Sequence, residues 1–160
     1  MKKMLGRIKD IVKKWTSINE EDILHGIFED KNLQKTILDL NRIGQLFEKG
    51  LQADGTHTGD YSPVSVNVYG KRAGHITLYD TGDFYKSFLF VNLDGGFMIS
   101  ADTLKDVSDF VSMNQAGSGV KIDLTDRWHH PLGLTKQSIG ELRPAVREAI
   151  MKAVRQKLAA

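Results

Sequence analysis

The best hairpin signal in the chain is SFLFVNLDGGFMISA, residues 87–101. Two runs rich in apolar and aromatic residues flank Asp94-Gly95-Gly96. An Asp-Gly pair between two such runs favours the tight turn of an antiparallel hairpin, because glycine accepts the positive φ that this turn requires. We therefore predict a β-hairpin whose strands are residues 87–93 and 97–101.

Upstream of the hairpin, the pattern is mainly helical. Asn19 is the expected N-cap of a helix, since the acidic residues 20–22 follow it in the first turn, where the helix dipole favours negative charge. The helical pattern continues with a break near residues 30–32 and ends at Gly50, a common C-terminal stop. Its apolar face carries Leu33, Ile37, Leu40, Phe47 and Leu51.

Between this helical run and the hairpin, polar turn-forming residues dominate. Residues 52–63 are rich in Gly, Asp and Thr and predict an exposed loop. In residues 64–69, valines alternate with Ser, Asn and Tyr, which is the period of a half-buried strand. We expect a second short extended segment at residues 75–79.

Downstream of the hairpin, we predict a short helix at residues 103–113 and a loop at residues 114–126. A helical C-terminus follows Pro144, with Val146, Ile150, Val154 and Leu158 spaced by four. Helices at both ends of a small sheet define an α+β class. The expected fold is a small antiparallel sheet packed with a long N-terminal helix and a C-terminal helix.

The N-terminus has the pattern of an amphipathic cationic helix. Its apolar residues recur at helical spacing, and lysines fill most of the opposite face. The apolar set is Met4, Leu5, Ile8, Ile11, Val12 and Trp15. An isolated helix this short is marginal in water, so this face needs a partner. We interpret residues 1–18 as an arm that docks on a partner, and residues 19–160 as a single α+β domain.

Charge is segregated along the 160 residues. The net charge is only +2, yet residues 1–15 carry +5 and residues 143–160 carry +4, whereas residues 16–142 carry −7. Such separation indicates contacts between subunits or with a phosphate backbone. The chain has no cysteine, which excludes disulfides and thiolate metal sites. We expect neither a membrane span nor a signal peptide, because no apolar run is long enough and the N-terminus is charged throughout.

The segment Leu78-Tyr79-Asp80-Thr81-Gly82-Asp83 is the sharpest local motif. Its Asp-Thr-Gly resembles the active-site turn of aspartic proteases, and a single copy would have to dimerise to pair two aspartates. Asp83 departs from that family, in which Ala or Ser is usual. We favour a helix start instead, with Asp80 as N-cap, Asp83 at the third helical position, and Tyr79 packed on Phe84 across the cap.

From about residue 76 onward, the order of features resembles the virion morphogenesis and head–tail joining (tail-completion) proteins of tailed phages. Both have an Asp-Thr-Gly-type turn, a hairpin strand, a short helix, a variable loop, an Arg–Pro–Leu-Gly-Leu stretch and a final amphipathic helix. The matching residues are Asp80, Thr81, Gly82, Phe84 and Ser87, followed by Arg127, Pro131, Gly133 and Thr135. We expect these residues to fix backbone geometry rather than to perform chemistry.

The resemblance implies a structural, ring-forming subunit of a tailed-phage neck or tail, and not an enzyme. It implies a location in the virion after synthesis in the host cytoplasm. From the residues themselves, we expect no cofactor and no metal. The implied partners are further copies of the chain, portal/connector or tail-tube proteins, and, as an open point, DNA passing through the ring. Two alternatives remain: a dimeric aspartic protease that uses Asp80, and a peripheral module that binds a partner or a membrane through residues 1–15.

Overall fold

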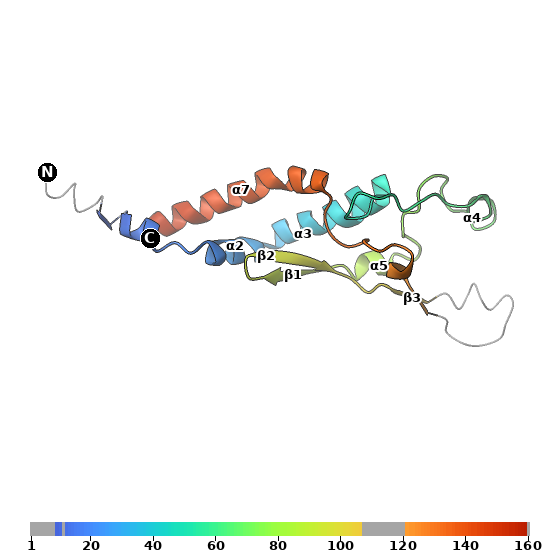
Figure 1. Cartoon of the computed structure of the whole chain (residues 1–160), viewed down its shortest axis with the longest axis horizontal. Coiled ribbons are helices and arrows are strands. Elements are labelled where there is room, and N and C mark those ends of the chain that lie inside the picture. The colour runs from blue at the N-terminus through green and yellow to red at the C-terminus, as the bar shows by residue number, and fades with distance from the viewer. Residues whose placement is uncertain (1–8, 11, 107–120, 160) are drawn as a thin grey trace.

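The computed structural model describes residues 9, 10, 12–106 and 121–159. The molecule is elongated and layered, with a long C-terminal helix above a helical middle layer and a β-hairpin below (Figure 1). The first and last described residues lie at one end, which we name the helix end. The opposite end carries loops and a short helix from residues 51–82 and 124–135, and we name it the loop end.

Three helical segments form the middle layer: α2 (Glu20–Phe28), α3 (Lys31–Asp39) and the π-helix η1 (Leu40–Lys49). The Asn19 side chain accepts a hydrogen bond from the Glu21 backbone N–H at 3.0 Å, which confirms the predicted N-cap. Asp30 caps α3, so the chain breaks where we expected. Gly50 ends η1 with φ 60°, as predicted.

The predicted hairpin is confirmed as β1 (Leu89–Leu93) and β2 (Gly96–Ser100), paired antiparallel. Leu93 pairs with Gly96, which leaves Asp94-Gly95 as a two-residue turn with Gly95 at φ 78°. On the inner face, the Phe97 ring lies 5.2 Å from both Phe28 and Phe90. These aromatic contacts fix the hairpin to the middle layer.

A second two-stranded sheet joins β3 (Leu104–Asp106) to β4 (Lys121–Asp123). The predicted helix at residues 103–113 is therefore wrong over residues 103–106, and residues 107–113 lie outside the described residues. The predicted loop at 114–126 is also wrong in its last part, which contains β4 and the 3-10 helix η2 (Leu124–Asp126). Pairing between segments distant in sequence, which no local pattern encodes, decides this region.

The predicted strand at residues 64–69 is wrong, because the chain forms the short helix α4 (Pro63–Asn67) there. Ser62 Oγ accepts the Ser65 N–H at 3.1 Å, and Pro63 occupies the first turn, where its missing N–H costs nothing. Val64 and Val68 are 58% and 69% exposed. The alternation of valines therefore has no sheet against which to be buried.

The last helix, α7 (Lys136–Ala159), begins ahead of Pro144, so the predicted start at Pro144 is wrong. Thr135 Oγ1 accepts the Ser138 N–H at 3.1 Å and supplies the cap. Pro144 lies inside the helix, where it lacks the N–H that would bond to Gly140. Val146, Ile150 and Val154 pack against the core.

The core lies between α7, the middle helices and the hairpin, and it confirms the α+β class. Its buried apolar residues are Ile23, Ile27, Phe28, Leu33, Ile37, Leu46, Tyr85, Phe88, Ile99 and Leu142. Ile37 and Leu46 have no exposed surface. Within the described ranges, no helix is both long and apolar enough to cross a membrane.

Candidate functional site

The Asp80 turn leads into the helix α5 (Asp83–Lys86), but Asp80 does not cap it. The N-cap residue is Gly82 at φ 84°, and Asp83 is the first helical residue rather than the third. Thr81 Oγ1 donates to the Asp83 carboxylate at 2.5 Å and accepts the Asp83 N–H at 3.4 Å. The predicted Asp80 cap is therefore wrong, because the left-handed Gly82 places another residue at the helix start.

Asp80 instead joins two lysines. Its carboxylate pairs with Lys105 Nζ at 2.6 Å and with Lys71 Nζ. Hydrogen bonds from Lys105 and then Lys71 hold the pKa of Asp80 below its ordinary value. The three side chains, which we name the Asp80 cluster, link the loop before the turn, the turn itself and β3. A proton-sharing pair of aspartates requires one raised pKa, which is opposite to this environment.

Tyr79 and Phe84, which we predicted to pack on each other across the cap, share Tyr85 as a neighbour. The Tyr85 ring centre lies 5.3 Å from that of Tyr79 and 5.8 Å from that of Phe84. Tyr85 donates its hydroxyl proton to the Thr77 carbonyl, and burial raises the pKa of that hydroxyl. Ser87 Oγ donates to the Phe84 carbonyl at 2.7 Å and so closes α5.

Two fully buried amide side chains on η1, Asn41 and Gln45, hold the segment before α7. Asn41 Nδ2 donates to the Pro131 carbonyl at 3.2 Å, and its Oδ1 accepts the Gly133 N–H at 3.0 Å. Gln45 Nε2 donates to the Gly133 carbonyl at 2.9 Å, and its Oε1 accepts the Thr135 N–H at 2.8 Å. This amide clamp pairs each side chain with two backbone groups, much as a neighbouring strand would.

The clamp continues into the loop that follows η1. Gln52 Oε1 accepts the His130 N–H at 3.1 Å, and the His130 carbonyl accepts the Ala53 N–H at 2.8 Å. Trp128 Nε1 donates to the Thr58 carbonyl at 2.8 Å. Residues 128–135 are therefore fastened along their length to η1 and to the loop that follows it. The predicted turn residues Pro131, Gly133 and Thr135 all lie in this fastened segment.

At the helix end, the described residues of the arm are helical at 9, 10 and 12–16. Val12 and Trp15 are 54% and 55% exposed, so their own domain leaves these apolar side chains uncovered. Lys14 Nζ donates to the Leu158 carbonyl at 3.4 Å, beside the last turn of α7. The other residues proposed for docking, Met4, Leu5, Ile8 and Ile11, lie outside the described residues.

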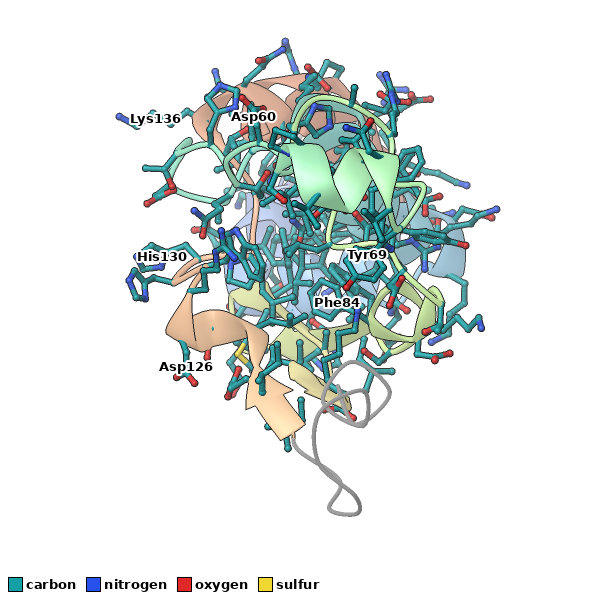
Figure 2. The ribbon with its side chains drawn as sticks, turned by 90° about the vertical axis from the view of Figure 1, so that its right-hand side faces the viewer. Asp60, Tyr69, Phe84, Asp126, His130 and Lys136 are labelled. Carbon is teal, nitrogen blue, oxygen red and sulfur yellow. The ribbon has the colours of Figure 1, made fainter. Side chains whose placement is uncertain are left out.

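The two ends differ in chemistry. At the helix end, the described lysines of the arm meet the last turn of α7, through the bond from Lys14 to the Leu158 carbonyl. Asp22, in the acidic first turn of α2, lines one groove with Lys152 and Lys157 of α7. At the loop end, α4 lies across the face, with Tyr69 and Phe84 beneath it and His130 and Lys136 to one side (Figure 2). The exposed Val64 and Val68 belong to this face.

Two of the histidines contact backbone carbonyls. His75 Nε2 lies 2.9 Å from the Phe47 carbonyl, and His129 Nδ1 lies 3.2 Å from the Thr125 carbonyl. Over the part of the chain that the structure describes, no three His, Asp or Glu side chains gather closely enough to hold a metal ion. Comparisons of the chain with protein-family models, with curated proteins and with solved structures gave no match.

Proposed function

We propose that this chain is a structural, ring-forming subunit of a tailed-phage neck or tail, acting in head–tail joining or tail completion. The observation that carries the proposal is an elongated molecule with exposed apolar side chains at two chemically different ends (Figures 1 and 2). In this proposal its partners are further copies of the chain and the adjoining portal/connector or tail-tube proteins. It is made in the host cytoplasm and resides in the virion.

Ring closure depends on two unlike surfaces. A head-to-tail contact uses a different patch on each partner and closes only when the rotation per subunit is constant. Val12 and Trp15 lie among lysines at the helix end, and Val64 and Val68 lie at the loop end. Two unlike faces suit a subunit that contacts different neighbours at its two ends, whereas a two-fold dimer needs a single self-complementary face.

A constant rotation also requires a stiff subunit. The amide clamp ties α7 to η1, and the Asp80 cluster ties β3 to the turn before α5. Both devices connect segments far apart in sequence without providing reactive groups. Their positions coincide with the two motifs of the phage-protein resemblance, at residues 80–87 and 127–135.

The protease alternative receives less support. A dimeric aspartic protease needs an Asp80 that can share a proton with its copy. Here two lysines neutralise the carboxylate and stabilise its ionised form. Moving both lysines away would be a prerequisite for proteolysis.

The proposal is tested on particles of the phage whose genome encodes the chain. Antibody labelling and reconstruction should place several copies in one closed ring at the neck or the tail end. Removal of the gene should leave heads and tails unjoined or tails unfinished. Purified virions that lack the protein, together with normal particles after gene removal, would refute it. Binding to anionic vesicles by a chain that is absent from virions would favour the peripheral-membrane alternative.

A further inference from the structure

A groove of about 530 Å³ opens between α2 and α7 at the helix end. Its floor is apolar and consists of Ile23, Ile27, Ala149 and Ala153, with Gly26 exposed between them. Ile23 and Ile27 are core residues, so the floor is a fixed part of the fold. A groove of this form accepts the apolar face of a helix, which inserts side chains at three- and four-residue spacing.

The α2 wall of this groove is acidic. Asp22 and Asp30 line it, and Glu20, Glu21 and Glu29 are exposed nearby. On the arm, Lys9 and Lys13 flank Val12 on one side of the apolar stripe. A helix seated by Val12 and Trp15 would bring these lysines to the acidic wall. The α7 wall carries Lys152 and Lys157, so a basic helix fits this groove only when its lysines face α2. The arm can be seated this way, because Lys9 and Lys13 lie together on one side of its apolar stripe. With that orientation, charge favours the basic arm of this protein as the occupant.

The described residues of the same chain's arm, 9, 10 and 12–18, do not line the groove. They lie at the end of α7, where Lys14 bonds to the Leu158 carbonyl (Figure 1). Side-chain hydrogen bonds close its last turn, from Thr16 Oγ1 to the Lys13 carbonyl and from Ser17 Oγ to the Lys14 carbonyl, both at 2.9 Å. With Val12 and Trp15 exposed and the groove open, each copy has one donor and one acceptor surface.

We infer that the α2–α7 groove receives the N-terminal arm of a second copy of this chain. The inference rests on the proposed ring function and names the contact that joins neighbouring subunits: the helix end supplies both the arm and the groove, and the loop end is left for the adjoining neck or tail proteins. Each subunit gives its arm to one neighbour and accepts an arm from the other. Such a contact is heterologous and propagates around a closed ring.

Cysteine cross-linking gives a direct test, because the natural chain contains no cysteine. The full-length Val12→Cys and Gly26→Cys variants are mixed, oxidised mildly, and analysed by mass spectrometry of linked peptides. Any disulfide between positions 12 and 26 then joins two molecules. A Cβ at Gly26 meets nothing within 4 Å, so the substitution does not disturb the monomer. Gly140→Cys is the matched control, since Gly140 is also an exposed helical glycine with open space.

Docking raises the effective thiol concentration to about the millimolar range. The 12–26 disulfide should therefore form at least about tenfold faster than the 12–140 disulfide. Equal rates would overturn the inference. A diluted Val12→Cys/Gly26→Cys double variant that forms mainly intrachain disulfides would also overturn it, because each arm would then fill its own groove.

A blocking variant separates this inference from the proposed function. Gly26→Gln places a side chain in the groove and raises helix propensity. Gly140→Gln raises the helix propensity of α7 equally, but at a position that does not line the groove. Gly26→Gln should abolish both the docking of the arm in the groove and the incorporation of the protein into particles. Gly140→Gln should retain both. Normal incorporation of Gly26→Gln would refute the groove contact while leaving the ring function intact. Arm–groove cross-links in a protein that is absent from virions would support the contact and refute the phage function.

Discussion

Gln45 Oε1 accepts the backbone N–H of Thr135 at 2.8 Å, although the two residues lie 90 positions apart. Gln45 belongs to the π-helix η1, and Thr135 caps α7. The bond therefore connects the end of the middle layer to the start of the top layer. Because Gln45 is fully buried, water cannot replace either of its hydrogen bonds.

Replacing Gln45 by methionine should destabilise the fold strongly. Methionine is close to glutamine in size but has no amide group. The Gly133 carbonyl and the Thr135 N–H therefore lose their hydrogen-bond partner. Each buried backbone group that loses its bond costs about 1–3 kcal/mol. Denaturant unfolding of Gln45→Met against Gln137→Met measures this cost, since exposed Gln137 should change stability by no more than about 0.5 kcal/mol. Equal effects of the two substitutions would show that the amide clamp contributes nothing.

Replacing Asp80 by asparagine should lower stability at neutral pH by about 0.2–1 kcal/mol for each ion pair lost. The folded-state pKa of Asp80 is depressed, so its stabilisation is present above the ordinary aspartate pKa of about 3.9 and disappears as pH falls through the lower folded value. The difference between wild type and Asp80→Asn should therefore shrink under acid. Unfolding free energies measured from neutral pH down to strong acid provide the check.

Asp94→Asn is the control for this titration, because Asn-Gly is equally favoured in the hairpin turn. It should change the free energy of unfolding little at neutral pH. If Asp80→Asn matches it throughout, the Asp80 cluster carries no stabilising charge interaction. Raised salt should reduce the Asp80 effect as well, since these side chains remain partly exposed.

Replacing Gly50 by alanine should be far more damaging than the same change at Gly55. Both glycines have positive φ, 60° and 86°, so both substitutions carry backbone strain of about 1–2 kcal/mol. Only at Gly50 does the new Cβ approach another side chain, within 2.6 Å of His75. The difference in melting temperature between the two variants measures that collision. Matching melting temperatures would mean that His75 moves aside without cost.

Deleting residues 1–15 should leave the domain folded with nearly unchanged melting behaviour. Val12 and Trp15 are more than half exposed, so their removal takes little from the core. The truncated chain should nonetheless fail to enter particles. Thermal melting and particle composition, compared with the full chain, test both parts. Failure of the truncated chain to fold would show that residues 1–15 belong to their own core.

Local chemistry explains which elements were predictable. Asn19, Gly50 and the Asp94-Gly95 turn each act on their immediate neighbours, and the structure confirms all three. The strand predicted at residues 64–69 is wrong, because the helix start at Ser62-Pro63 outweighs an alternation of valines that has no sheet beside it. Asp80 failed as a cap because its lysine partners come from other segments.

We did not predict the amide clamp, because its hydrogen-bond partners also lie far apart in the sequence. Asn41 and Gln45 are polar residues on the buried side of a helix, and their partners lie in a backbone segment about 90 positions away. A pair of amides four residues apart on an otherwise apolar face was the available signal. It indicates buried hydrogen bonds but does not identify the acceptor and donor groups that satisfy them.

The π-helix η1 affects how this chain should be aligned with its relatives. A π-helix closes each hydrogen-bonded turn over one residue more than an α-helix, as in the bond from the Gly50 N–H to the Gln45 carbonyl. A relative one residue shorter between Leu40 and Lys49 could therefore keep the same contacts by winding as an α-helix. Gaps at this place should be positioned by the amides that meet the Gly133 and Thr135 backbone, and not by counting from Gly50. Insertions and deletions here then record a change of helix type rather than a lost interaction.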